Sequence, residues 1–430
     1  MGMQLEKPKL FPEKQTFIWF VSILLLLIGI RLVFHYHTYQ EFIAKPFYYT
    51  HATVITSYEK NKKNKRYHVL KLKSDEGFTF YTTSHRREGF KHKRLRLQIF
   101  PNESIKFRDY LGTFYVKSKI KYQEKLPIML KDRLLDYVAN QHQNSAMATF
   151  YNAIFFATPL EKALREKIAL LGISHLVALS GFHLAILWGL VYGLLLLFYQ
   201  PLQQKYFPYR QALFDVGIVA MTILGYYVWF VDFPPSLVRS FAMVLVGWGV
   251  LLLGIELLSF SFLVSVFLFL ILLFPSLLVS LSFWLSAAGV FYIFLLLQYT
   301  KTWNKWLITL GALPIGIFML MLPVVHTIFG VTSLYQLISP MLSLLFVFFY
   351  PFVILLHFLG LGGIFDTYLL WLFSLPADSA ENIIPLGVAL GYLGLSIVAI
   401  WYRKVFYLLL GLAILYMFYL FIFVEQVTKL

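Results

Sequence analysis

The chain has 430 residues, of which 59% are apolar and 13% charged, and its formal net charge is +16 at pH 7. The apolar residues fall in long runs of about 20, the length that a helix needs to cross a bilayer, which excludes an ordinary soluble protein. Cysteine is absent, which excludes disulfides, thiolate metal sites and a cysteine nucleophile. The expected fold is a polytopic α-helical membrane protein with about nine or ten transmembrane helices and an inserted small OB-like β-barrel.

A basic tail and the first apolar run make up residues 1–44. The run at 17–34 is too long for a signal peptide and lacks a small-residue cleavage site, so we expect it to remain as an anchor. Lys7, Lys9 and Lys14 precede it and favour a cytoplasmic N-terminus. The segment that follows is then expected in the periplasm or outside the cell.

Residues 45–122 are expected to form this basic OB-like β domain. Polar and apolar residues alternate from Arg94 to Ile99, and turn signals at 60–64, 74–77 and 101–104 divide the segment into five or six strands. Such a basic segment suits nucleic acid or anionic lipid, with a solvated surface as the alternative. Its aromatic residues either stack on bases or fill the core: Tyr67, Phe80, Tyr81, Phe90 and Phe107. The candidate DNA-binding residues are Lys62, Lys63, Lys65, Arg66, Arg86, Arg87, Lys93, Arg94 and Arg96.

The remaining chain is expected to be helical. Residues 123–175 form an amphipathic or interfacial segment, and residues 176–430 form the main membrane domain. Within it, 365–374 is short and interrupted by an aspartate, which favours an interfacial or re-entrant segment. The expected spans lie near 176–198, 212–231, 236–254, 257–274, 279–298, 306–325, 335–358, 383–402 and 405–424.

Four polar segments interrupt these spans and are candidates to line an aqueous path, because polar groups in a membrane are costly and normally face the interior of a helix bundle. In the first, 173–183, a Ser-Gly step predicts a helix break; ordinary helix packing is the alternative. In the second, 232–239, Arg239 either pairs with Asp232 or contacts a phosphate. The third, 281–289, is a face of small residues, and the fourth, 322–340, carries prolines that favour a cavity. The candidate path residues are Ser174, His175, Ser180, Gly181, His183, Asp232, Arg239, Ser282, Ser286, His326 and Ser333.

The absence of two common catalytic motifs reduces the number of possible functions. The chain has no P-loop and no H-E-x-x-H zinc motif, so we expect no ATPase motor, zinc hydrolase site, metal or cofactor of its own. The remaining alternatives to a channel are a secondary transporter of a small anion and an intramembrane hydrolase with Ser180 as nucleophile and His183 as base.

The four segments, in this order, resemble the ComEC family of competence proteins. The run from Gly172 to His183 resembles the family segment G-[LI]-x-H-[LI]-x-A-x-S-G-x-H, and the later segments resemble P-x-x-x-R, L-S-F-x-L-S and P-x-x-x-x-x-F. The resemblance is to a short form without the C-terminal metallo-β-lactamase-like domain that many members carry.

This resemblance implies an inner-membrane channel that translocates single-stranded DNA during natural transformation, and not an enzyme. The partners it implies are single-stranded DNA, the lipid bilayer, a periplasmic DNA receptor and a cytoplasmic helicase or motor. A separate nuclease is implied where the second strand is degraded, and a homo-oligomer is a further expected assembly.

Overall fold

The computed structural model describes residues 10–62, 65–86, 89–90, 92–127, 129–252, 259–375 and 379–424. Contacts between residues divide the chain into two units. The sheet unit comprises Phe11–Arg133 and Val264–Phe283. The helical unit comprises Met1–Leu10, Leu134–Leu263 and Trp284–Leu430. Each unit is described separately below.

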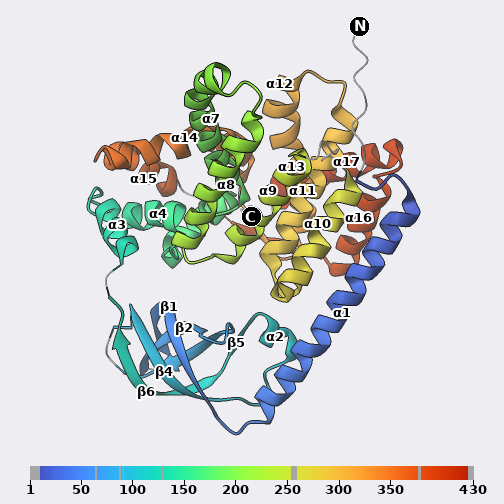
Figure 1. Cartoon of the computed structure of the whole chain (residues 1–430). Helices are drawn as coiled ribbons and strands as arrows, with labels where there is room; N and C mark the ends of the chain where they lie inside the picture. Colours follow the sequence, from blue (N-terminus) through green and yellow to red (C-terminus); the bar gives the residue numbers. More distant parts are fainter. Residues whose placement is uncertain are drawn as a thin grey trace. The chain divides into compact units, whose positions relative to one another are not determined.

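The sheet unit contains six strands in the order β5-β3-β2-β1-β4-β6 (Figure 1). Neighbouring strands are antiparallel except for β3 and β5, which are parallel. The expected five or six strands are therefore present, and the turns at 74–77 and 101–104 fall between strands as predicted. The strands are β1 (Tyr48–Lys62), β2 (Lys65–Ser74), β3 (Thr79–Ser84), β4 (Lys93–Phe100), β5 (Thr113–Tyr115) and β6 (Lys117–Lys125).

One face of this sheet is a closely packed apolar core. Leu70, Leu72, Phe80, Leu95 and Leu97 have no exposed surface, because alternate residues of a strand point to the same face. The hydrogen-bonded ladders leave β5 and β6 as edges, so the described strands form no closed barrel and the expected OB-like barrel is not shown.

Two helices pack against this core within the sheet unit. The end of α1 (Lys14–Ala44) contributes Phe42, which is 5% exposed and contacts the ring of Phe114. The short helix α2 (Phe107–Leu111) follows β4, and Tyr39 of α1 donates a hydrogen bond to the carbonyl of Ile105, just before α2. The first span and the sheet are therefore joined by packing as well as by the chain.

The helical unit is built from apolar helices with two very short strands. Helices α3, α10 and α11 cross the boundary between the two units. The elements are α3 (Leu130–Ala139), α4 (Ser145–Phe156), α5 (Lys162–Leu170), α6 (Ser174–Val177), α7 (Gly181–Tyr206), α8 (Ala212–Phe230), α9 (Pro235–Leu252), α10 (Phe260–Leu273), α11 (Leu281–Thr300), α12 (Lys305–Leu307), α13 (Leu313–His326), β7 (Val331–Thr332), α14 (Ser339–Phe358), α15 (Asp366–Ser374), β8 (Ala380–Glu381), α16 (Leu386–Val398) and α17 (Arg403–Phe418).

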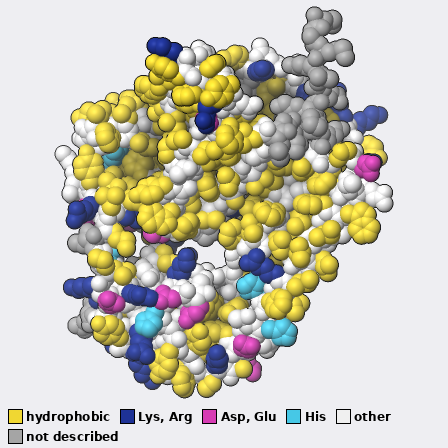
Figure 2. Space-filling view, in the orientation of Figure 1, with side chains coloured by type: hydrophobic (Ala, Val, Ile, Leu, Met, Phe, Trp, Pro, Cys, Tyr) yellow, Lys and Arg dark blue, Asp and Glu magenta, His cyan; other side chains and the backbone are white. Residues whose placement is uncertain are grey.

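Seven helices among the described residues are long and apolar enough to cross a membrane. They lie in Lys14–Ala44, Gly181–Tyr206, Ala212–Phe230, Leu281–Thr300, Lys305–His326, Leu334–Phe358 and Arg403–Ile422. The other three expected spans correspond to shorter apolar helices, Ser236–Leu252, Phe260–Leu273 and Leu386–Val398. Prolines contribute to this shortening, since Pro275 follows α10 and Pro385 precedes α16. Hydrophobic side chains cover much of the helical surface, as lipid contact requires (Figure 2).

Helix α4 is a core element rather than the interfacial surface expected for residues 123–175. Met147, Tyr151 and Ile154 of this helix have no exposed surface and pack in one cluster with Tyr350 and Val353 of α14. The residues of α4 that are not buried are half-buried or, as Ser145, exposed, so one side of α4 faces the core. In the neighbouring α5 only Leu164 and Ile168 are buried.

Candidate functional site

The first polar segment forms a turn between α6 and α7, and α7 begins at Gly181, as the Ser-Gly step predicts. The backbone N–H of Ser180 donates to Nδ1 of His183 at 3.3 Å, and the Ser180 hydroxyl lies 3.3 Å from the same nitrogen. The His183 ring is fully buried and meets Phe346 and Tyr350 of α14 edge to face. The Ser180–His183 pair thus caps the start of α7, a structural role that requires no catalysis.

The second polar segment joins this turn through hydroxyl groups. Ser236 donates to the carbonyl of Leu179 at 2.7 Å, and Ser240, one turn later on α9, donates to the carbonyl of Ser236 at 2.8 Å. A Cβ atom at Gly181 would lie only 2.7 Å from the Ser240 hydroxyl oxygen. Glycine is therefore required where α7 and α9 approach each other.

The fourth polar segment reaches the same turn from the other side. Ser339, the first residue of α14, donates to the carbonyl of Gly172 at 3.0 Å, and Nε2 of His175 lies 3.2 Å from the Ser343 hydroxyl. Gly172 has φ of +68°, a left-handed conformation that favours glycine, and packs against Gln336. Ser174 and His175 are exposed. We call this meeting point the motif junction: Gly172, Ser174, His175, Ser180, Gly181, His183, Ser236, Ser240, Ser339 and Ser343.

The motif junction gathers polar groups from three segments that are far apart in the sequence. It presents hydroxyls, an exposed imidazole and the start of a helix inside an otherwise apolar bundle. These groups exchange hydrogen bonds readily but include no cluster of charges, so they suit weak contacts with a passing polar chain better than tight binding of one ion. Ser236 and Ser339 lie in the predicted segments without having been singled out, and Ser240 and Ser343 lie just beyond those segments, because only the fold shows which serines face the turn.

The other predicted path residues do not belong to the motif junction, although Arg239 is next to Ser240 in the sequence. Arg239 is buried in α9, with 4% of its surface exposed. His326 is buried at the end of α13, where its Nδ1 is 2.9 Å from the carbonyl of Leu322 and its Nε2 is 3.0 Å from the hydroxyl of Thr332, beside the buried Ser333. On α11, Ser282 is exposed and Ser286 half-buried. No hydrogen bond described for Ser282, Ser286, His326 or Ser333 reaches the motif junction.

The loop between α8 and α9 is strained. Asp232 and Phe233 both have positive φ values, +66° and +52°. This conformation costs about 1–2 kcal/mol for each residue that is not glycine, and a bulky aromatic residue adopts it rarely. Two such residues stand directly before the Pro234-Pro235 pair that opens α9. The loop thus holds α9 in a defined position against α8.

The outer face of the sheet carries aromatic and basic side chains in adjacent positions. Arg96 lies opposite His51 on one side and Tyr122 on the other, and its guanidinium lies 5.9 Å from the ring centre of Tyr49. Tyr49 and Tyr122 are 48% and 63% exposed. Figure 2 shows Lys and Arg gathered with other charged groups on this part of the chain. We define the aromatic-basic face as Tyr49, His51, Lys71, Lys73, Tyr81, Arg94, Arg96, Tyr115, Lys119 and Tyr122.

Some of the predicted DNA-binding residues occupy this face and others do not. Arg96 is exposed on it, and Arg94 is half-buried there in an ion pair with Asp75. Lys93 is 9% exposed and donates to the amide oxygen of Gln123, so it is not presented on this face. Arg66 and Arg86 are exposed outside the face. Lys63 and Arg87 lie outside the described residues, and only the backbone of Lys62 and Lys65 is described.

The predicted aromatic residues are mostly structural. Phe80 and Phe90 are buried in the core, and Phe107 packs against the rings of Tyr36 and Tyr39. Tyr67 and Tyr81 are half-buried. Among the described residues of 45–122, the exposed Phe and Tyr rings are instead Phe47, Tyr49, Tyr58, Tyr115 and Tyr122. Tyr49, Tyr115 and Tyr122 belong to the aromatic-basic face, and their prediction would have required the strand register.

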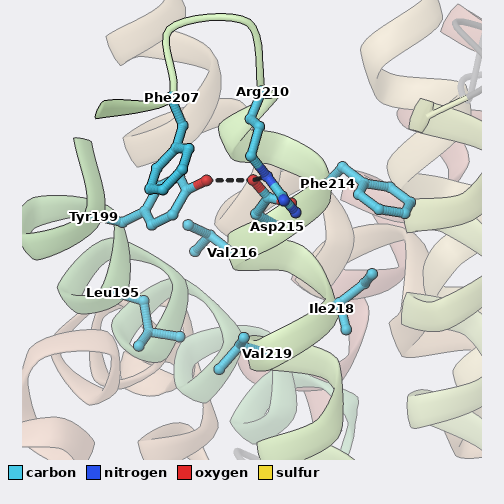
Figure 3. A pocket seen from close by; sticks show the side chains of 9 residues that line it. All are labelled: Leu195, Tyr199, Phe207, Arg210, Phe214, Asp215, Val216, Ile218 and Val219. Atoms are coloured by element: carbon cyan, nitrogen blue, oxygen red, sulfur yellow. Dashed lines mark hydrogen bonds and ion pairs between the residues drawn. The ribbon is translucent and has the colours of Figure 1, made fainter. Parts of the chain in front are cut away.

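An apolar pocket of about 430 Å³ lies at the turn between α7 and α8, capped by polar groups (Figure 3). Nε and Nη2 of Arg210 donate to the carboxylate of Asp215 at 2.7 and 2.5 Å, and the Tyr199 hydroxyl donates to the same group. These bonds raise the pKa of Arg210 above its ordinary value. The arrangement ties the end of α7 to the start of α8 and neutralises the carboxylate. The described residues contain no cluster of His, Asp and Glu side chains suited to a metal ion.

Comparison with known proteins gives one match. Residues 157–423 match the family model described as competence protein. The matched range includes most of the helical unit, though not α4, and every residue of the motif junction. A search of curated proteins and a search of solved structures each found no match.

Proposed function

Because the chain belongs to the competence protein family, a multi-pass membrane family with a role in DNA uptake, we propose that it translocates single-stranded DNA across the cytoplasmic membrane. In this proposal the N-terminus is cytoplasmic and the sheet unit lies outside the cytoplasm. The chain acts as a channel and not as an enzyme. The force for transport and the removal of a second strand then come from other proteins.

The motif junction carries this proposal. It lies within the matched range, and it is the place where hydroxyls and an exposed histidine meet among apolar helices. A strand that crosses a membrane carries one negative charge for each phosphate and must exchange contacts quickly as it moves. Neutral hydroxyl and imidazole groups supply such contacts without holding the strand. Ser174, His175 and Ser180 are the residues that we propose to line the path.

The aromatic-basic face supports a second step, capture of the strand. Single-strand binders combine aromatic rings, on which bases stack, with cations that follow the backbone. Tyr49, Arg96 and Tyr122 provide this combination on adjacent strands. Binding is then expected to weaken steeply with salt, because each neutralised phosphate releases counterions.

We also propose that the sheet is OB-like. Its edge strands β5 and β6 are separated along the chain by Val116 alone, and the hydroxyls of Thr82 on β3 and Ser118 on β6 lie 2.7 Å apart. The chain therefore comes close to closing the sheet on itself, although no ladder joins the edges. OB folds commonly bind single strands on such a curved face.

The proposed partners supply activities that we do not assign to this chain: an energy source, delivery of the DNA and removal of one strand. Transport in one direction needs an energy source, and we propose a cytoplasmic helicase or motor. A periplasmic DNA receptor would deliver the duplex, and a separate nuclease would remove one strand. The lipid bilayer is the remaining partner, and a homo-oligomer would provide a wider path than one chain.

The test is entry of labelled DNA into the cytoplasm of cells that lack the gene and carry either the wild-type chain or His175→Ala. The duplex is labelled in one strand or in both, so that the label shows which strands enter. We expect cells without the chain to hold the label outside the cytoplasm and His175→Ala to reduce entry at an unchanged amount of membrane protein. His175→Gln is the matched control, because its amide can keep the contact with Ser343. Normal cytoplasmic entry without the gene would refute the proposal.

A further inference from the structure

Three ionisable side chains outside the motif junction form a continuous chain of contacts. Nδ1 of His142 lies 3.0 Å from both carboxylate oxygens of Asp366, and Nε2 of His142 lies 3.0 Å from Nε2 of His357. The other nitrogen of His357, Nδ1, lies 2.6 Å from the carbonyl of Val353. These residues come from the turn before α4, the last turn of α14 and the first residue of α15.

Because these three side chains are largely buried, their protonation state decides whether their contacts are favourable. The His142 side chain is fully buried, His357 is 4% exposed, and the Asp366 side chain is 16% exposed. Asp366 is thus the member through which a proton enters from solvent. Inside the protein, a polar contact between two groups of the same kind, two donors or two lone pairs, is not relieved by water and is strongly unfavourable.

The number of bound protons follows from donor and acceptor roles. A carbonyl only accepts, so Nδ1 of His357 carries a proton, and in the neutral ring its Nε2 is an acceptor. His142 must then donate from Nε2 to His357. An ionised Asp366 also only accepts, so His142 must donate from Nδ1 as well, which makes it an imidazolium. The observed contacts are all satisfied with three protons on the three groups.

Loss of one proton breaks a contact. With two protons, a lone pair of neutral His142 faces either the carboxylate or the lone pair of His357, each at 3.0 Å. A fourth proton can be bound by the partly exposed Asp366, whose other oxygen still accepts from His142, so only the loss of a proton necessarily breaks a contact. The third proton is shared between the two histidines. If it moves from Nε2 of His142 to Nε2 of His357, every contact stays satisfied and only the donor between these two nitrogens changes.

The surroundings favour a cation at His142. Its ring stacks on Tyr151 with centres 4.5 Å apart and planes at 7°, and an aromatic face attracts a cation. Burial raises the pKa of the Tyr151 phenol, so this neighbour stays neutral. The ionisable side chains of α5, which packs against α15, are exposed: Lys162, Arg165, Glu166 and Lys167. Asp136 on α3 is also exposed.

The three side chains also lie beside hydrogen bonds that join the backbone of this region. The Gln141 amide donates to the carbonyl of His357 at 3.0 Å, and the N–H of Gly362 donates to the Gln141 side chain at 2.8 Å. The contact between His142 and His357 therefore helps to fix the turn before α4 against the start of α15. Loss of the third proton releases this tie.

We propose that Asp366, His142 and His357 form a proton-binding site that fixes the turn before α4 to the ends of α14 and α15 only while at least three protons are bound. Chains of Asp and His in membrane proteins serve proton relay or pH sensing. Here the third proton acts as the ligand, and the contacts in the structure are those of the protonated state. The site is independent of DNA transport, so it stands or falls separately from the proposed function.

The test uses spin labels on the full-length protein in lipid nanodiscs. The chain has no cysteine, so cysteines at Gln143 and Tyr368, both exposed, can be labelled alone. The distance between them is measured from about pH 5 to about pH 10, which spans the ordinary pKa of histidine. We expect a single narrow distance near neutral pH and a broader, longer distribution at alkaline pH, where the third proton is lost.

Asp366→Asn provides the decisive variant. The asparagine amide donates to a neutral His142, so all contacts are satisfied with no third proton and the alkaline transition should disappear. His357→Gln should abolish it too, because its amide donates or accepts as needed, and Asp136→Asn is the matched control that should behave as wild type. A wild-type distance that does not change with pH, or an unchanged alkaline transition in both Asp366→Asn and His357→Gln, would overturn the proposal.

Discussion

The contact between Gly181 and Ser240 gives a sharp test of how the motif junction is packed. A Cβ atom at position 181 would lie 2.7 Å from the Ser240 hydroxyl oxygen and 3.2 Å from its Cβ. Ordinary contacts between such atoms are near 3.5–4.0 Å, so Gly181→Ala must displace Ser240 or move α7 from α9 by roughly 1 Å. Ser240 is 5% exposed and its hydroxyl is bonded to Ser236, so it cannot turn away without losing that bond.

Either response destabilises the protein. Overpacking typically costs about 1–3 kcal/mol, and breaking the Ser240 hydrogen bond costs about 1 kcal/mol. We therefore expect Gly181→Ala to lower the free energy of unfolding by about 1–3 kcal/mol. At about 2.1 cal/mol/K of unfolding entropy per residue, a chain of 430 residues that unfolds as one unit then has a Tm lower by roughly 1 °C per kcal/mol.

The assay is thermal unfolding of the purified protein in detergent at one fixed scan rate. Gly189→Ala is the matched control, because it is on the same helix and a Cβ there meets nothing within 4 Å. Its Tm should stay level or rise, since alanine favours a helix. The double variant Gly181→Ala with Ser240→Ala should recover most of the loss. Equal Tm values for Gly181→Ala and Gly189→Ala would show that the described approach of α7 to α9 is wrong.

Other substitutions test separate features. Tyr122→Ala should weaken binding of labelled single-stranded DNA to the full-length protein by about 1–3 kcal/mol, measured by fluorescence anisotropy, whereas Tyr122→Phe should bind as wild type because the ring remains. Arg96→Ala should reduce the slope of log affinity against log salt by about 0.7, and Arg108→Ala on α2 should not. Gly217→Ala should lower the Tm because its Cβ would meet the Trp248 ring, while Gly247→Ala, which meets nothing within 4 Å, should not. Equal effects within any of these pairs would contradict the corresponding contact.

The helical class was predictable because lipid imposes a simple requirement, a long apolar run for each span. Helix lengths were less predictable. The break before α7 was visible as a Ser-Gly step, but α10 and α16 are shorter than their apolar runs suggest. Their ends depend on prolines and on neighbouring loops as well as on hydropathy.

In the sheet, the alternation of polar and apolar residues predicts which face of a strand a residue occupies, but not its neighbours on other strands. Lys93 shares a strand face with Leu95 and Leu97, so period-two alternation alone could have placed it with the core and Arg96 with the outer face. Tyr122 was beyond such reasoning, because its position opposite Arg96 depends on the pairing of β4 with β6 and on a register shift beside it.

The motif junction and the site of His142, His357 and Asp366 also differ in how far the sequence predicts them. The residues 172–183 of the motif junction are contiguous and carry a recognisable pattern. His142 is separated from His357 by 215 positions and from Asp366 by 224. No local pattern connects such residues, and each one alone resembles an ordinary polar residue in a loop or at a helix end. Only the packing of α4 against α14 and α15 brings them together.

The edges of the sheet have a consequence for the protein's fate before it reaches its membrane. An exposed edge strand can pair with another chain and start aggregation. Here β5 has only three residues, and β6 carries Lys117, Lys119, Lys121 and Lys125. A second copy that added to β6 would bring a second row of lysines beside the first. The lysines that make this unit basic are therefore also expected to oppose the pairing of this edge with a second copy.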